Sequence, residues 1–138
     1  MSAGYAATTL AKKLGIKEGA AVKLVNAPAD YFNLFTDWPA NVTIITNSKT
    51  PADCIHLFVA NTNELLKHLL PLKKQLKPAG MLWVSWYKKA AKIATDITED
   101  VIRNQALANG LVDIKVCAVD EQWSGLKLVI PVKYRPAG

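Results

Sequence analysis

A run of seven almost entirely apolar residues, CIHLFVA at 54–60, is the feature that most constrains the fold. Its length suits a β-strand, and the lack of an alternating polar position is typical of a parallel strand that is covered on both faces. Helices packed on the two faces of a sheet supply such cover. The run therefore predicts a central strand in an α/β sheet.

Segments with strand and helix periodicity alternate around this run. Asn61 and Glu64 form a capping box for a leucine-rich helix, which Pro71 is expected to kink or restart. Asp96 and Glu99 form a second capping box. Strands are predicted at 21–27, 42–46, 54–60, 81–86, 112–118 and 126–132, and helical patterns at 8–14, 30–38, 97–109 and in the stretch after residue 61.

The last two predicted strands alternate apolar and polar residues, so each is expected to be half-buried. The connection at 120–125 is short enough for an antiparallel hairpin. Pro131 cannot donate to a ladder, which places the last strand at an edge. The alternation of strands and helices before this hairpin predicts a mostly parallel sheet with right-handed crossovers.

Length and composition predict one folded domain over residues 1–138, because 51% of the residues are apolar and only 20% are charged. No run approaches the roughly 18 apolar residues that cross a bilayer, so we expect a cytoplasmic protein without membrane contact. Cys54 and Cys117 lie in strand contexts without metal or redox spacing and are expected to be buried thiols.

Two stretches, LGIKEGAAVKLVNAP and LLPLKKQLKPAGMLWVSW, are similar to the first strand and the fifth-strand entry of class I S-adenosylmethionine-dependent methyltransferases. The resemblance implies a three-layer, Rossmann-like α/β fold with a mostly parallel sheet of about six strands and a C-terminal antiparallel hairpin. The loop NAPADY stands where that family has glycines, and Asn47 stands where it has an acid for the ribose. Residues 47–53 are too few for the family's next helix and strand. We therefore expect no conventional cofactor.

Over nearly its full length the chain also resembles a family of small bacterial proteins catalogued as a domain of unknown function, number three-zero-five-two. The segments GYAATTLAKKLGI, ATDITEDVIR and VDIKVCAVDEQWSGLKLV carry this likeness. It brings no activity that can be transferred.

Ligands of open α/β sheets bind beyond the carboxyl ends of the strands, so the candidate site is expected there. The polar and aromatic side chains at these ends suit a small polar or anionic ligand. The asparagines among them also fit a purely structural role as caps or turn residues. Asp96 either complements the helix dipole or faces the lysines across the pocket mouth. The candidate ligand-binding residues are Asn26, Pro28, Asn47, Asn61, Trp86, Lys88, Lys89 and Asp96.

Catalytic and metal motifs are not found in the sequence. His56 and His68 are the only histidines, and neither accompanies a recognisable nucleophile motif or a carboxylate at zinc-ligand spacing. We therefore predict no catalytic residues and no metal, and favour a non-catalytic binding or interaction domain. Its expected partner is a protein or a small anionic ligand.

Three alternatives remain open. One is a small transferase that holds an adenosine-containing cofactor in an atypical way, through Asn26, Asn47 and Trp86. Another is nucleic-acid binding, because the net charge is +6 and lysines occur in pairs, although a basic footprint requires one continuous face. The third concerns Trp123, which is either an exposed interface anchor in a turn or folded back onto the sheet.

Overall fold

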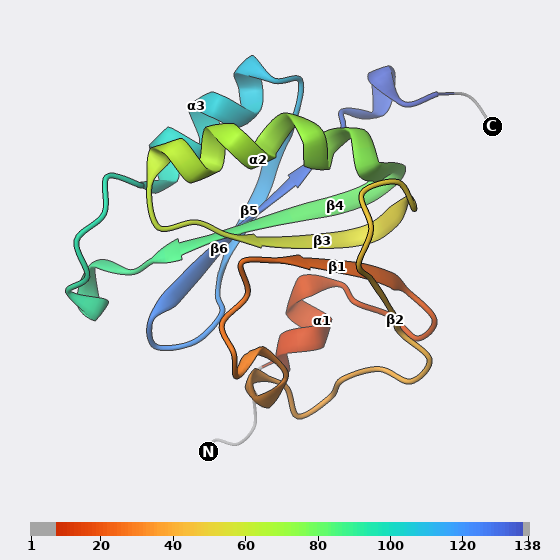
Figure 1. Ribbon diagram of the computed structural model, residues 1–138, viewed down its shortest axis with the longest axis horizontal. Helices are drawn as coiled ribbons and strands as arrows, with labels where there is room; N and C mark the ends of the chain where they lie inside the picture. The colour runs from red at the N-terminus through yellow and green to blue at the C-terminus, as the bar shows by residue number, and fades with distance from the viewer. Residues whose placement is uncertain (1–7, 137–138) are drawn as a thin grey trace.

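A six-stranded sheet runs through the middle of the protein, whose computed structural model describes residues 8–136 (Figure 1). The strand order is β2-β1-β3-β4-β6-β5; the first four strands of this order are parallel, and β6 is antiparallel to both β4 and β5. The predicted Rossmann-like α/β fold, with its closing hairpin, is confirmed. The strands are β1 (Ala21–Val25), β2 (Thr43–Ile45), β3 (Ala52–Phe58), β4 (Leu76–Tyr87), β5 (Val112–Ala118) and β6 (Trp123–Val129).

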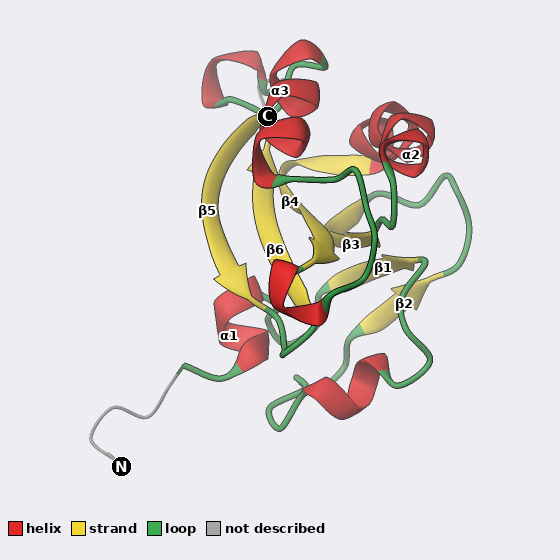
Figure 2. Ribbon diagram, turned by 90° about the vertical axis from the view of Figure 1, so that its left-hand side faces the viewer, coloured by secondary structure: helices red, strands yellow, loops and turns green. Residues whose placement is uncertain are grey.

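Helices cover the sheet on both faces (Figure 2). On one face lie α2 (Thr62–Gln75) and α3 (Glu99–Ala108), and on the other lies α1 (Leu10–Leu14) with a 3₁₀ turn at Tyr31–Leu34. Two further 3₁₀ turns occur at Lys89–Ala91 and Val132–Tyr134. No helix within residues 8–136 combines the length and apolar character needed to cross a membrane.

The central strand β3 explains why the core has two halves. Successive side chains of a strand point to opposite faces, so Ile55 and Leu57 pack beneath α2 and α3 while Cys54 and Phe58 pack beneath α1. Almost every residue of β3 is buried. The continuous apolar run thus predicted its central, doubly covered position correctly.

Residues 47–53 were predicted to be too few for the helix and strand that methyltransferases have at this point, and the structure has neither element there. A loop joins β2 directly to β3, and β2 forms one edge of the sheet with three residues. The side chain of Asn47 holds this loop, because its Oδ1 accepts from the amides of Lys49 (2.8 Å) and Thr50 (2.7 Å).

Two helical predictions need correction. The aromatic stripe at 30–38 forms only the short 3₁₀ turn, and the rings of Phe35 and Trp38 pack on Tyr31 at centroid distances of 5.2 and 6.3 Å. Ring packing on the sheet, not a helix face, produces that spacing. Helix α2 does not restart at Pro71 but continues through it to Gln75, and Pro71 lies on its exposed side.

Predictions at the carboxyl-terminal part of the chain were also partly wrong. The last strand is not at an edge: β6 ends at Val129, before Pro131, and inserts between β4 and β5. The edge strand on this side of the sheet is β5. The N-cap of α3 is Thr98, whose hydroxyl accepts from the amide of Val101 (3.2 Å), so the second capping box is not formed as predicted.

Candidate functional site

Most of the predicted site residues lie at one end of the sheet, where the parallel strands have their carboxyl ends. Asn26 and Pro28 follow β1, Asn61 lies three residues beyond β3, and Lys88 follows β4. The chain runs from β1 to β2 on one side and from β3 to β4 on the other, so strand order reverses between β1 and β3. This is the position at which α/β sheets bind ligands.

The loop after β1 is tightly formed although it lacks glycine. Asn26 adopts a left-handed conformation with φ of 58°, which asparagine tolerates better than most residues. The carbonyl of Pro28 accepts from the amide of Tyr31 (3.0 Å) and starts the 3₁₀ turn. Within residues 8–136 the amides of Ala27, Ala29 and Asp30 donate to no acceptor of the protein. The loop therefore has three amides without an acceptor in the described part of the chain, although it contains a proline and two alanines.

A buried chain of polar groups lies beneath this loop. Tyr31 Oη is 2.9 Å from His56 Nδ1, and His56 Nε2 is 2.7 Å from Ser85 Oγ. All three side chains are at most 1% exposed. Burial lowers the pKa of His56 to about 3 and raises the pKa of Tyr31 above its ordinary value, so the imidazole is neutral at physiological pH. These two hydrogen bonds satisfy the buried polar groups of Tyr31, His56 and Ser85, and the three side chains are too deeply buried to contact a substrate.

Sequence reasoning missed this chain because its members come from a loop, β3 and β4. The available signal was His56 within the run at 54–60: a histidine in a strand covered on both faces must be neutral and must find partners for both ring nitrogens. The pattern shows that partners are needed. It does not show which residues they are.

A cavity of about 750 Å³ opens at the carboxyl end of β4. Trp86 and Tyr87 line it from the strand, Lys88 and Lys89 from the following turn, and the start of α3 closes it. Trp86 is 8% exposed, so the indole forms an apolar wall. Three predicted residues, Trp86, Lys88 and Lys89, thus meet in one cavity of a size that suits a small ligand.

Two acidic residues, Glu99 and Asp100, also line this cavity, but they form ion pairs with Arg103 and not with its lysines. Asp100 and Glu99 pair with Arg103 of the same helix, with 2.7 Å between Arg103 Nη1 and Asp100 Oδ1. No ion pair joins Lys88 or Lys89 to a carboxylate among the described residues. The cavity therefore offers two cations to a ligand.

The other predicted side chains bond to nearby backbone. Asp96 Oδ1 accepts from the amide of Thr62 (2.8 Å) and ties its loop to the start of α2. Asn61 caps α2 by accepting from the amide of Glu64 (2.9 Å), and Glu64 Oε1 accepts from the amide of Ala60 (2.6 Å), so the first capping box is formed as predicted. Asn61 thus acts as the cap of its structural alternative, whereas Asp96 bonds to the start of α2 and not to that of the helix that follows it.

Trp123 is a core side chain, which corresponds to the second of its two alternatives. It is 8% exposed and stacks on Tyr87 with 4.1 Å between ring centroids, and Phe58 meets it edge-on at 4.9 Å.

The free thiol of Cys54 is buried, and that of Cys117 is half-buried. No group of three potential metal ligands occurs in the chain between residues 8 and 136.

Comparison with known proteins shows the fold but not a family. No family profile matches the sequence, and the search of curated proteins also gives no match. The likeness to the small bacterial family of unknown function stays a prediction.

Solved structures similar to this chain include several methyltransferases. A SAM-dependent methyltransferase from Aquifex aeolicus has a TM-score of 0.60 and 19% identity, with 86% of each chain covered. The ribosomal protein L11 methylase from Lactobacillus delbrueckii subsp. bulgaricus has a TM-score of 0.57 and 11% identity, over 86% of this chain and 73% of that one. Fibrillarin from Methanococcus jannaschii, a pre-rRNA processing protein, has a TM-score of 0.54 and 15% identity, over 83% and 68%. The chain therefore has the fold of class I SAM-dependent methyltransferases.

Proposed function

We propose that the protein is a small methyltransferase-like transferase that binds an adenosine-containing cofactor at the carboxyl-end edge of its sheet. One observation carries the proposal: in a methyltransferase-type strand order, a cavity with two lysines that form no ion pair among the described residues opens at the carboxyl end of β4, the end of the sheet at which such folds bind ligands. Fold likeness alone does not establish an activity. The chemistry of the edge supplies the remaining support.

The loop after β1 fits the polar part of such a cofactor. The free amides of Ala27, Ala29 and Asp30 are donors for carboxylate or ribose oxygens, which a glycine-rich loop would otherwise bind. Asn47 stands where methyltransferases have the acid for the ribose, but its side chain is bonded to its own loop. The exposed carboxylate of Asp30 can accept from a ribose hydroxyl instead. When bound, the cofactor supplies the activated group that is transferred.

The cavity beside β4 fits the acceptor of that group. Lys88 and Lys89 favour an anionic acceptor, and the indole of Trp86 gives its apolar part a surface. The volume of about 750 Å³ limits the acceptor to a small molecule or to one residue of a larger one.

Isothermal titration calorimetry with S-adenosylmethionine and its demethylated product tests the cofactor. We expect micromolar dissociation constants for the wild-type protein and at least fivefold weaker binding for Asp30→Ala. Glu18→Ala is the matched control, because it removes one exposed carboxylate at the opposite end of the sheet. If neither compound gives a heat of binding at millimolar concentration, the proposal is contradicted.

A second function, a non-catalytic binding domain for a small anionic ligand or a protein, is favoured by one observation. Asn47, Asn61 and Asp96 bond to backbone amides, so few side chains at the edge are available for chemistry. In that case inorganic pyrophosphate binds at the lysines while S-adenosylmethionine does not. Replacing both Lys88 and Lys89 by glutamine then abolishes pyrophosphate binding.

The control for that experiment replaces Lys67 and Lys74 by glutamine. Both lie on exposed positions of α2, so the double variant removes the same charge elsewhere. Either function fits a cytoplasmic protein with free thiols at Cys54 and Cys117, and this location stays a proposal.

A further inference from the structure

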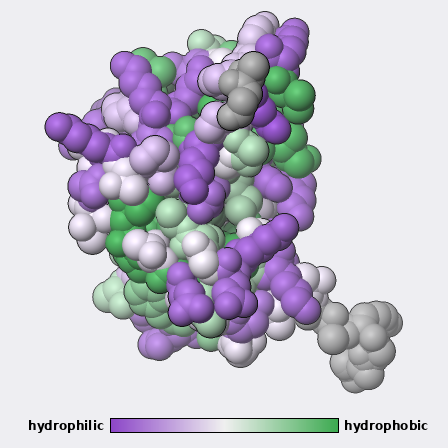
Figure 3. Space-filling model, turned by 90° about the vertical axis from the view of Figure 1, so that its right-hand side faces the viewer, coloured by the Kyte–Doolittle hydropathy of each residue, from purple (hydrophilic) through white to green (hydrophobic). Residues whose placement is uncertain are grey.

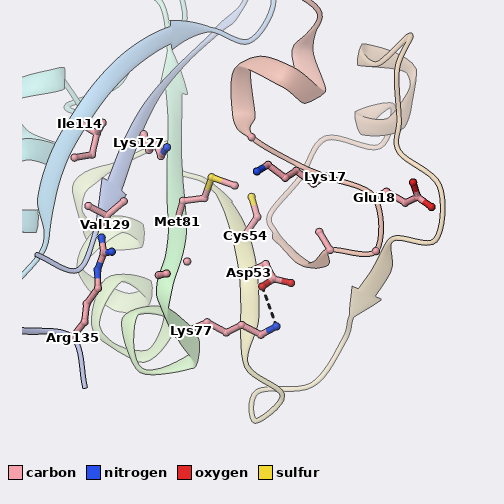
Figure 4. Close-up of a pocket in the computed structure, with 15 residues that line it drawn as sticks. Lys17, Glu18, Asp53, Cys54, Lys77, Met81, Ile114, Lys127, Val129 and Arg135 are labelled. Carbon is pink, nitrogen blue, oxygen red and sulfur yellow. Dashed lines mark ion pairs between the residues drawn. The ribbon is translucent and has the colours of Figure 1, made fainter. Parts of the chain in front are cut away.

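A second groove lies at the opposite end of the sheet from the candidate site. Its volume is about 730 Å³, and it opens at the amino ends of β1, β3 and β4. Figure 3 faces this end of the molecule and shows apolar surface flanked by hydrophilic side chains. Figure 4 shows side chains from β3, β4, β5 and β6 around the hollow.

Two irregularities of the sheet shape this groove. Ala52 of β3 pairs with Leu76 and Cys54 pairs with Met81, so four residues of β4 at 77–80 bulge opposite a single residue of β3. A second register shift in β5, between Asp113 and Lys115, brings Ile114 to the groove. Bulges often lie beside functional sites because they redirect side chains.

The floor of the groove is apolar. The thioether of Met81 lies at its centre in Figure 4, with Val129 and Ile114 on one side and the thiol of Cys54 on the other. The groove can therefore take up an apolar ligand body without burying unpaired polar groups.

The two carboxylates of the groove are already engaged. Asp53 lies 2.9 Å from Lys77 Nζ and also accepts from the amide of Ala21 (2.8 Å). Glu18 accepts from Asn41 Nδ2 at 3.4 Å and points away from the hollow in Figure 4. Neither acid is placed to neutralise further cations.

Three other cations of the groove have no carboxylate partner in the part of the chain that the structure describes. Lys127 and Lys17 reach toward the space beside Met81 (Figure 4). Arg135 is held at the end of β6, because its Nε donates to the carbonyl of Ile130 (2.9 Å). The groove is thus positively charged as well as apolar.

One of these cations also faces a like charge. Lys127 is the direct cross-strand partner of Lys115, and paired residues of an antiparallel ladder lie on the same face. Like charges at such positions destabilise a sheet. A bound anion beside Lys127 relieves this repulsion.

We propose that this groove binds a small amphipathic anion, a molecule with an apolar body and one carboxylate or phosphate head. The body lies on Met81, Val129 and Ile114, and the head lies between Lys127 and Lys17. Charge complementarity selects the anion, and the apolar floor distinguishes it from a simple inorganic ion. The site is separate from the cofactor edge.

Methionine-methyl NMR tests the proposal directly, because the protein contains only Met1 and Met81. The protein is labelled at the methionine methyl carbon and titrated with octanoate and, separately, with 1-octanol of the same chain length. We expect saturable shifts of the Met81 resonance and at least tenfold tighter binding of octanoate. In Lys127→Gln this preference falls below twofold, and in the control Lys67→Gln it is unchanged.

Lys17→Gln gives an independent variant, with the same expected loss of preference, in case Lys127→Gln does not fold. An unshifted Met81 resonance at 10 mM octanoate overturns the proposal, and so does equal binding of octanoate and octanol. A shift caused only by a short single-stranded oligonucleotide overturns it as well and assigns the lysines to nucleic acid. Because Met81 is remote from the β1 loop, failure here leaves the cofactor proposal standing.

Discussion

Acidification within a narrow pH range tests the buried Tyr31–His56–Ser85 chain. Each ring nitrogen of His56 has a hydroxyl partner at 2.9 or 2.7 Å, and the side chain is fully buried among aromatic rings. A proton added to this imidazole enters an apolar core without a counter-charge. The folded state is therefore expected to resist protonation, whereas the unfolded chain accepts it.

The magnitude follows from the pKa of His56, which burial lowers from 6.5 to about 3. Between these values the unfolded state binds a proton that the folded state does not, so the unfolding free energy falls as the pH falls. Each pH unit in this range costs about 1.4 kcal/mol. Going from about pH 7.5 to about pH 5 therefore removes about 2 kcal/mol, a large share of the stability of a small domain. The carboxylates with lowered pKa, Asp37 and Asp53, lose their contribution only at lower pH.

Urea denaturation followed by tryptophan fluorescence measures this loss at several pH values. His56→Gln is expected to be less stable at pH 7.5, because a buried hydroxyl loses a partner at a cost of about 1–3 kcal/mol. Its stability is expected to change little from pH 7.5 to 5. His68→Gln, on the less buried side of α2, serves as the control and keeps the wild-type slope. An equal pH slope in wild type and His56→Gln refutes the reasoning.

Three further predictions concern helix α2, the strand bulge and a thiol. Pro71→Ala restores a backbone donor inside α2 and is expected to raise the unfolding free energy by about 1–3 kcal/mol in thermal denaturation; an unchanged or lower value contradicts this. Gly80→Ala places a Cβ 3.0 Å from the carbonyl oxygens of Ala52 and Asp53 and is expected to cost about 1–3 kcal/mol, whereas an unaffected Tm contradicts the close packing. The pKa of Cys54 is raised to about 12 by burial, so iodoacetamide at pH 8 is expected to modify Cys54 only after unfolding, as peptide mass mapping will show.

Much of the fold was predictable because its signals are local. The uninterrupted apolar run at 54–60 requires cover on both faces and is covered on both. The alternation at 112–118 marked a strand correctly, but the prediction that this strand is half-buried was wrong, because β5 lies at an edge and Ile114 and Val116 are exposed. The errors arose where distant partners decide the local conformation. Pro71 stays within α2 because it lies on the exposed side, and the rings at 30–38 take their places from the sheet beneath them.

The candidate site was predictable only in part, for the same reason. Parallel strands share a carboxyl end, so Asn26, Asn61 and Lys88 could be placed at one edge without knowing their contacts. The cap formed by Asn61 was predicted from the sequence, whereas the bond from Thr62 to Asp96 appeared only in three dimensions. The second groove gave no signal, because the strand pairings that create it join Cys54 to Met81 and Lys115 to Lys127 across the sheet.

The interior position of β6 has a consequence for synthesis on the ribosome. Because β6 follows β5 in the chain but lies between β4 and β5 in the sheet, β4 has no neighbour on that side until residues 123–129 have emerged. During that interval the nascent protein carries an open, strongly apolar strand border, the kind of surface that chaperones bind and that promotes aggregation. Stalled or shortened chains that end before Trp123 are therefore expected to be insoluble.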